Sequence, residues 1–276
     1  MVPDGISHSG SVYSVSFSPD GGSVLTSSGD GLAQVFDARS GKLLLRIETP
    51  PDCDGQRCRL RAASWRPDGR QIATASDGKK ACIWDTQGSS GIGGVLSNPV
   101  LCVRHDELVY SVSWDGDGGQ IVTTSGDRTA IVWDAQTGRD VVTFYGEDFD
   151  FRSAEFLVKG AFQQVMTRNG DRALRFWDMD TSHPVAKVTH RQSFLTSAVM
   201  DKSGERLVTA ATDGTARIWT LSSFDALAEI ARARIPRCLS HAQRQRYNFN
   251  PGVQPIPTWC TGKLHGPPTR SEIARQ

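Results

Sequence analysis

Short runs of alternating apolar and polar residues recur along the first 220 residues, and each ends at a turn rich in glycine or aspartate. This period of two predicts half-buried β-strands. Five segments align by their ends, which fall at residues 37, 85, 134, 178 and 220: SVLTSSGDGLAQVFD, RQIATASDGKKACIWD, GQIVTTSGDRTAIVWD, FQQVMTRNGDRALRFWD and ERLVTAATDGTARIWT. Each segment predicts two strands joined by a tight turn, for which Asp-Gly is a favoured pair.

A further strand precedes each segment, as in SVYSVSF and LVYSVSW, and an outer strand follows four of them, as in KLLLRIE, PVLCVR, DVVTFY and PVAKVT. The repeat therefore has four strands. Its successive ends are 48, 49, 44 and 42 residues apart, close to one propeller blade plus variable loops. We expect an all-β fold, a β-propeller of four-stranded blades, over residues 1–220.

These segments resemble the WD-repeat (WD40) family over nearly all of residues 8–220. The resemblance implies a buried relay of His, Ser/Thr, Asp and Trp side chains that are hydrogen-bonded within each blade. Carried over by position, the relay residues of the five blades are His8, Thr26 and Asp30; Thr74, Asp77 and Trp84; His105, Thr123, Asp127 and Trp133; Thr167, Asp171 and Trp177; and His190, Thr209, Asp213 and Trp219.

The relay is complete in the third and fifth blades only. The first blade has Phe36 in place of Trp, and the second and fourth have no evident His. A Ser-His-Asp hydrolase needs one such site, whereas these sets recur in blade after blade. We therefore interpret them as structural networks, with no catalytic residue among them.

The pattern changes after Trp219. Phe224, Leu227, Ala231 and Ile235 follow helical spacing, and a Pro/Gly-rich stretch comes later, so residues 221–276 are expected to form a short helical tail that becomes irregular. The tail carries a net charge of +5 against −4 for the first 220 residues. It resembles the C-terminal ends of bacterial WD-repeat proteins, which implies a sensor or assembly role beside a signalling or effector domain.

Five blades are visible, and the fifth has no outer strand in the pattern. The resemblance implies seven blades in a typical ring, so the sequence predicts an incomplete ring. We expect a part of a longer protein with upstream blades, in preference to an open array that a second chain completes.

Candidate partner-binding residues lie near the start of the first strand of each blade. Aromatic and arginine side chains are enriched at interaction hot spots. The residues proposed to contact a peptide or a protein domain, with an acidic partner among the candidates, are Tyr13, Arg61, Tyr110, Arg152 and Phe194. The alternative interpretation is an ordinary solvated loop rim.

Other chemistry is weakly indicated. Cys53 and Cys58 form a C-x₄-C pair without a second ligand pair, and Cys82 and Cys102 fall within strands as expected core residues, so we predict no metal site and no cofactor. No apolar stretch is long enough to insert in a membrane, no secretory signal is evident, and the expected location is the cytoplasm.

The sequence therefore predicts a non-enzymatic scaffold or sensor module that binds other proteins or peptides. Two alternatives stay open: nucleic-acid or anionic-surface binding through the basic tail, and an enzyme-type propeller with a site in the central channel.

Overall fold

A computed structural model describes residues 6–49, 53, 55–88, 93–146, 149–159, 162–189, 193–201 and 205–220. The chain divides into two compact units, Met1–Trp219 and Thr220–Gln276. The expected helical tail, residues 221–276, lies outside the described residues, so the first unit alone is described below.

The first unit is built from β-strands. The first sheet contains β1 (Val12–Phe17), β2 (Ser23–Ser28), β3 (Leu32–Asp37), β4 (Leu43–Glu48) and β8 (Gly94–Leu96). The second contains β5 (Leu60–Trp65), β6 (Gln71–Ser76), β7 (Lys80–Asp85) and β9 (Leu101–Arg104), with the short 3-10 helix η1 (Thr86–Gly88) after β7. The third contains β10 (Val109–Trp114), β11 (Gln120–Ser125), β12 (Thr129–Asp134) and β13 (Asp140–Tyr145).

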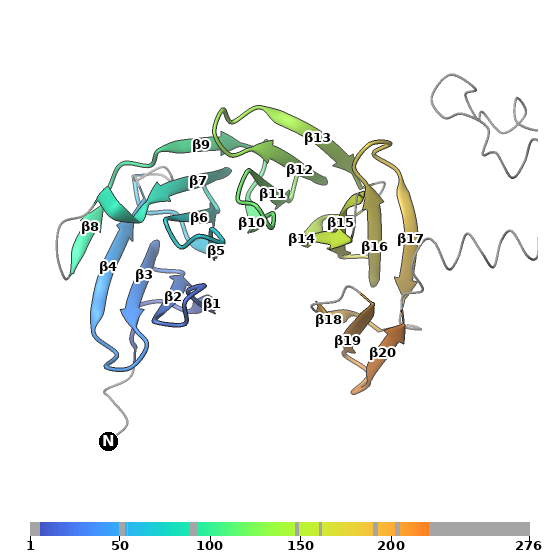
Figure 1. Cartoon of the computed structure of the whole chain (residues 1–276), viewed down its shortest axis with the longest axis horizontal. Helices are drawn as coiled ribbons and strands as arrows, with labels where there is room; N and C mark the ends of the chain where they lie inside the picture. Colours follow the sequence, from blue (N-terminus) through green and yellow to red (C-terminus); the bar gives the residue numbers. More distant parts are fainter. Residues whose placement is uncertain are drawn as a thin grey trace, which may run out of the picture. The chain divides into compact units, whose positions relative to one another are not determined.

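The fourth sheet contains β14 (Phe151–Lys159), β15 (Phe162–Asn169), β16 (Ala173–Asp178) and β17 (Pro184–Thr189). The fifth contains β18 (Leu195–Met200), β19 (Arg206–Ala211) and β20 (Ala216–Thr220). Figure 1 shows that β1, β5, β10, β14 and β18 all lie on the inner side of the series of sheets. The prediction of WD-type four-stranded propeller blades is confirmed, because consecutive strands of each blade pair antiparallel in chain order.

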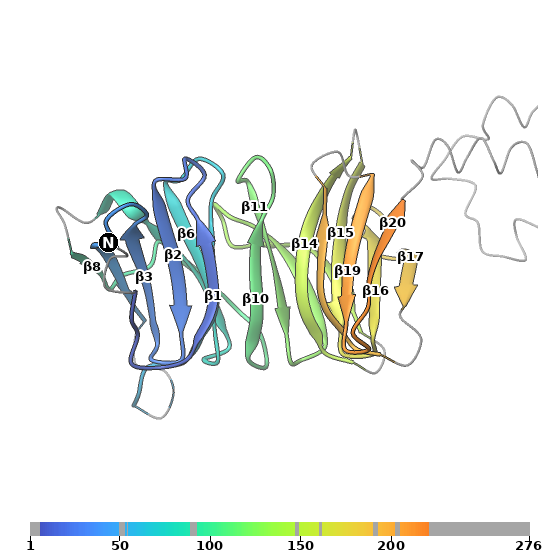
Figure 2. The same ribbon diagram turned by 90° about the horizontal axis from the view of Figure 1, so that it is seen from below.

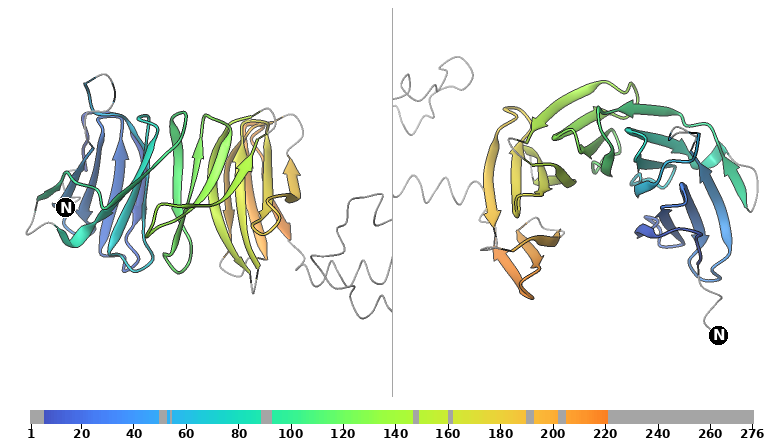
Figure 3. Two further views of the ribbon diagram at one scale, coloured as in Figure 1. Left: turned by 90° about the horizontal axis from the view of Figure 1, so that it is seen from above. Right: turned by 180° about the vertical axis from the view of Figure 1, so that it is seen from behind.

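The first sheet has one strand that the repeat pattern does not predict. Strand β8 comes from the connection between β7 and β9 of the second blade, yet it pairs parallel with β4, so that Arg46 lies opposite Val95. Leu96 from this strand is buried in the hydrophobic core that the first two sheets share. The connection thus adds an outer strand to the neighbouring blade, at the edge that Figure 3 shows from two further sides.

The hydrophobic cores lie between successive sheets. Strand β5 packs against the first sheet, β10 against the second and β14 against the third. Each of the three clusters of buried side chains combines residues of two adjacent blades: Leu25 and Trp84 in the first, Ile83 and Trp114 in the second, and Val132 and Trp177 in the third. Figure 2 shows the sheets standing next to one another in chain order.

The outward faces of the first and fifth sheets are apolar and exposed. Phe17 on β1 is 69% exposed, whereas Trp114, at the equivalent position of β10, is 7% exposed. On β20, Ile218 is 74% exposed, whereas Ile83 and Val132 at the equivalent positions of β7 and β12 are at most 1% exposed. The equivalent side chains are buried wherever a neighbouring blade packs against them. The first and fifth sheets therefore each expose an apolar face of the kind that contacts another blade elsewhere in the chain.

Candidate interaction surface

Each innermost strand begins with a local irregularity of the ladder. The register of β1 shifts between Val12 and Ser14, and β5, β10, β14 and β18 shift at the equivalent place. A β-bulge leaves one residue unpaired and turns its side chain away from the regular alternation. The residues at the five bulges are Tyr13, Arg61, Tyr110, Arg152 and Thr196. Four of the five side chains proposed from the sequence therefore share one structural position, and Phe194 lies just before β18.

These side chains stack in pairs across the junctions between blades. The Arg61 guanidinium lies over the Tyr13 ring at 5.3 Å from its centroid, and that of Arg152 lies over the Tyr110 ring at 4.5 Å. Phe194 is covered by Arg172 of the fourth blade at 4.6 Å. A guanidinium within about 6 Å of an aromatic centroid is attracted by the ring's negative face. The surface is thus a series of ordered arginine–aromatic pairs at one end of the blades, with Tyr13, Arg152 and Phe194 exposed.

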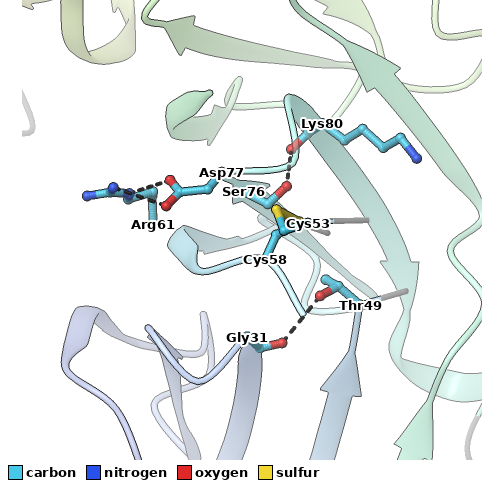
Figure 4. Close-up of a disulfide and its surroundings, with 8 residues drawn as sticks. All are labelled: Gly31, Thr49, Cys53, Cys58, Arg61, Ser76, Asp77 and Lys80. Carbon is cyan, nitrogen blue, oxygen red and sulfur yellow. Dashed lines mark hydrogen bonds and ion pairs between the residues drawn. A yellow bond between two sulfur atoms is a disulfide. The ribbon is translucent and has the colours of Figure 1, made fainter. Parts of the chain in front are cut away.

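Arg61 is also held by a carboxylate. Its Nε and Nη2 donate to the two oxygens of Asp77 at 2.6 and 3.1 Å, a two-point pairing shown in Figure 4. The hydrogen bonds from Arg61 to Asp77 are the largest cause of a raised pKa of this guanidinium. Asp77 was assigned from the resemblance to a histidine relay, but its blade has no such histidine, and the carboxylate binds Arg61 in its place.

The turn between the second and third strands contributes basic residues that the sequence analysis missed. This turn needs a residue with positive φ, which Gly31 and Gly214 supply in the first and fifth blades. In the second, third and fourth blades the same conformation is adopted by Lys79 (φ 63°), Arg128 (φ 68°) and Arg172 (φ 67°). The sequence signal for these two arginines was an Asp-Arg pair where the first and fifth blades have Asp-Gly. A non-glycine residue adopts this conformation at a cost in free energy, so its presence at the turn is informative.

The histidine relay is fully connected in the third blade. His105 is buried, its Nδ1 lies 3.0 Å from Asp127, and its Nε2 lies 2.7 Å from the Thr123 hydroxyl. The Thr123 hydroxyl also accepts a hydrogen bond from the Trp133 indole at 2.7 Å. Burial lowers the pKa of His105 in spite of the opposing effect of Asp127. Burial raises the pKa of Asp127, but the hydrogen bond from Thr129 and the charge of His105 outweigh it and leave this pKa lowered.

In the first blade, His8 lies 3.0 Å from Asp30 and 2.7 Å from the Thr26 hydroxyl, while Phe36 has no group to donate. The remaining blades keep the indole-to-threonine part. Trp84 donates to Thr74 at 2.9 Å, and the equivalent pairs Trp177 to Thr167 and Trp219 to Thr209 are 2.7 and 2.8 Å long.

The aspartate of the fourth blade differs from the expected pattern. Asp171 is bound by Arg175 and lies 3.9 Å from Lys187, so it does not join Thr167. Asp213 accepts from the backbone and hydroxyl of Thr215. His190 lies outside the described residues. The relay threonines and tryptophans lie inside strands and the aspartates in the turns between them, an arrangement that suits a structural network.

The cysteines correct one interpretation. Cys82 and Cys102, expected to be ordinary core residues, are directly opposite on β7 and β9 and form a disulfide. Cys53 and Cys58 form a second disulfide, in the connection between the first two blades (Figure 4). The Cys58 sulfur lies so close to Gly78 that a side chain at this glycine would meet it at 2.7 Å. Only the absent side chain lets this connection pack on the turn of the second blade.

In the part of the chain that the structure describes, no group of three or more His, Cys, Asp or Glu side chains is arranged to hold a metal ion. Within the same ranges, no helix is long and apolar enough to cross a membrane.

Comparison with known families agrees with the blade boundaries. The sequence model of the family described as "WD domain, G-beta repeat" matches residues 5–37, 51–85, 98–134 and 182–220, together more than half of the chain. The chain belongs to the WD40-repeat family. The matched segments correspond to the first three blades and the fifth blade. The fourth blade, in which Arg175 donates a hydrogen bond to Asp171, lies between the last two matched segments.

Curated relatives match over about a third of the chain. WD repeat-containing protein 1 of Gallus gallus is 36% identical over 83 residues, which is 30% of this chain and 13% of the relative. The Mus musculus protein of the same name is 35% identical over the same length, and that of Xenopus tropicalis is 33% identical over 85 residues. The chain therefore matches only about one seventh of the length of these relatives.

Proposed function

We propose that this WD40 propeller is a non-enzymatic protein-interaction scaffold that binds a peptide or a protein domain through Tyr13, Arg61, Tyr110, Arg152 and Phe194. WD40 repeats are in general protein-interaction modules, which supports the class of function. The observation that carries the proposal for this surface is the stacking of arginines on aromatic rings across three blade junctions. Pre-ordered side chains lose less conformational entropy on binding than free ones.

The alternatives have less support. An enzyme-type propeller needs converging carboxylates or metal ligands, and the relay aspartates described above are engaged in structural hydrogen bonds instead. Binding of nucleic acid through the basic tail would involve residues 221–276, which lie outside the described residues. The resemblance of that tail also leads us to propose that the propeller serves as the sensor part of a larger signalling or effector protein of bacterial type.

The two exposed end faces suggest how such a larger assembly is built. We propose that further WD-type blades, upstream in the same polypeptide or in a second chain, cover the face that contains Phe17 and the face that contains Ile218. A large apolar surface left in water is costly, and equivalent side chains are buried at the inner junctions.

The location of the protein stays a prediction. The cytoplasm is the location expected above, but disulfides persist mainly in oxidising compartments. The two disulfides therefore weigh against a reducing cytoplasm. Measuring the free thiols of the protein purified under alkylating conditions would decide between the two.

The test of the binding surface compares the wild-type chain with a variant carrying Tyr13→Ser, Tyr110→Ser and Phe194→Ser. Both would be immobilised, and the proteins retained from the source cells quantified by mass spectrometry, followed by calorimetry with each purified candidate. We expect at least one purified partner to bind the wild type and to lose about tenfold or more in affinity with the variant. Equal binding of every partner to both chains would refute the assignment of this surface.

A further inference from the structure

The arginines of the candidate surface are not equally available. Arg61 has both a carboxylate partner, Asp77, and an aromatic one, Tyr13. Arg152 stacks on Tyr110 but reaches its nearest carboxylate, Asp150, only at 3.7 Å. At this end, the second blade has Arg61 paired with Asp77 and Lys79 lying 3.4 Å from Glu107, while Arg152 in the fourth blade keeps spare hydrogen-bonding capacity.

Two further cations lie in the same sector. Arg128 and Arg172 are exposed at the turns of the third and fourth blades. Within the described ranges, no carboxylate lies within ion-pair distance of the Arg128 or the Arg172 guanidinium. The Arg172 guanidinium instead lies over the ring of Phe194. Both residues adopt the left-handed conformation that glycine supplies in the first and fifth blades. Backbone strain of this kind persists where the surrounding structure or a function requires the side chain.

Three acidic residues of this sector are already engaged or weakened. Asp127 is bound to His105 and Thr129, and Asp171 is bound to Arg175. Burial raises the pKa of Glu155 against the opposing charge of Arg168. None of these three carboxylates is free to neutralise the exposed arginines.

The arginines also act on one another. Arg168 donates to the Leu195 carbonyl and to the Ser153 hydroxyl, at 3.3 and 3.4 Å. Burial lowers the pKa of Arg168, and the positive charge of Arg152 lowers it further, against the opposing charge of Glu155. Since like charges are held within electrostatic reach of each other here, an anion placed over this sector would relieve a repulsion that the folded chain contains.

We infer that the surface binds a carboxylate-rich segment of a protein partner, and that this segment lies over the third to fifth blades, against Arg152 and Arg172. This inference rests on the proposed function and names the chemistry of the partner. A planar guanidinium binds a carboxylate by two parallel hydrogen bonds. Arg152 and Arg172 each lie over an aromatic ring, and Arg152 is 3.7 Å from Asp150, which leaves N–H groups of both guanidiniums for a further carboxylate.

A nucleic acid fits the same sector less well. Single strands combine phosphate contacts with stacking of bases on open aromatic faces. Here the rings of Tyr110 and Phe194 each have a face covered by an arginine. A peptide carboxylate needs no such stacking, so the geometry favours an acidic protein segment.

The test uses two fluorescent probes on the full chain: an octaglutamate peptide and an oligothymidylate of the same length. Binding is measured by anisotropy at roughly 50 mM and 200 mM salt, since screening separates electrostatic contacts from others. The test variant carries Arg152→Gln and Arg172→Gln. The matched control carries Arg70→Gln and Arg139→Gln, two exposed arginines in turns at the opposite end of the blades. Circular dichroism and thermal melting check that both variants fold.

We expect octaglutamate to bind the wild type, to lose about tenfold or more in affinity with the test variant, and to change less than about twofold with the control. Arg61→Gln should also have a small effect, because Asp77 already occupies that guanidinium. Equal losses in test and control variants, no octaglutamate binding, or tighter binding of the oligothymidylate would each overturn the inference. If a purified protein partner still depends on the aromatic residues while octaglutamate fails to bind, the proposed function stands and only the acidic chemistry is wrong.

Discussion

The hydroxyl of Thr123 is the best place to test the relay as a structural network. It is fully buried, accepts a hydrogen bond from Trp133 and lies 2.7 Å from His105 Nε2. Thr123→Val keeps the volume of the side chain, so little cavity cost is expected. It leaves two buried polar groups without their partner, at about 1–3 kcal/mol each. We therefore expect the free energy of unfolding to fall by about 2–6 kcal/mol.

The second blade supplies the matched comparison. Thr74 is equally buried, but it accepts only the Trp84 indole hydrogen bond, because this blade has no relay histidine. Thr74→Val should cost about 1–3 kcal/mol. Urea denaturation followed by far-ultraviolet circular dichroism gives both values, provided that the slopes against urea agree. Amide exchange of β11 and β6 shows whether each loss is local to its blade.

A double-mutant cycle makes the comparison decisive. In a His105→Leu background, Thr123→Val should cost no more than Thr74→Val, because the histidine partner is already gone. Equal costs of the two threonine substitutions in the wild-type background would refute the reasoning. So would an unchanged cost of Thr123→Val in the His105→Leu background.

Three further predictions concern other parts of the molecule. Replacing Cys82 and Cys102 by serine should lower the free energy of unfolding by about 3 kcal/mol, from the loop that the disulfide closes; equal urea midpoints with and without the pair would contradict this. Because burial holds the His105 pKa below its ordinary 6.5, the unfolded chain binds more protons just below that pH, so stability should fall on acidification through pH 6.5. His105→Gln should flatten this part of the pH profile in urea titrations. Ile83→Ala should cost about 2–5 kcal/mol and Ile218→Ala less than about 0.5 kcal/mol, a difference that denaturation of the chain alone would measure.

The repeated part of the fold could be predicted from sequence because each blade encodes its strands locally. The alternation of apolar and polar residues, together with the turn residues, correctly predicted that β2 pairs with β3 and β11 with β12. The outer strands were also found, although β9 is only four residues long. Strand β8 was not predicted, because three residues in a connection have too little pattern to indicate a parallel pairing with another blade.

The candidate surface was predicted in composition but not in arrangement. Tyr13 and Arg61 were recognised by their positions, yet their stacking depends on how two sheets pack, which one sequence does not specify. The disulfide between Cys82 and Cys102 likewise follows from the register of β7 and β9. Arg172 was missed because a basic residue in a turn is usually a solvated one, and its left-handed backbone is visible only in the structure.

Strand β8 also limits where this chain can be cut or rearranged. Repeat proteins are commonly treated as interchangeable modules whose units can be deleted, duplicated or circularly permuted. Here the first blade takes its outermost strand from the second, through the pairing of residues 94–96 with β4. Separating these two blades would leave the edge of β4 uncovered, and an uncovered edge pairs readily with other chains. The first two blades therefore form one indivisible unit, and an engineered boundary belongs after β9.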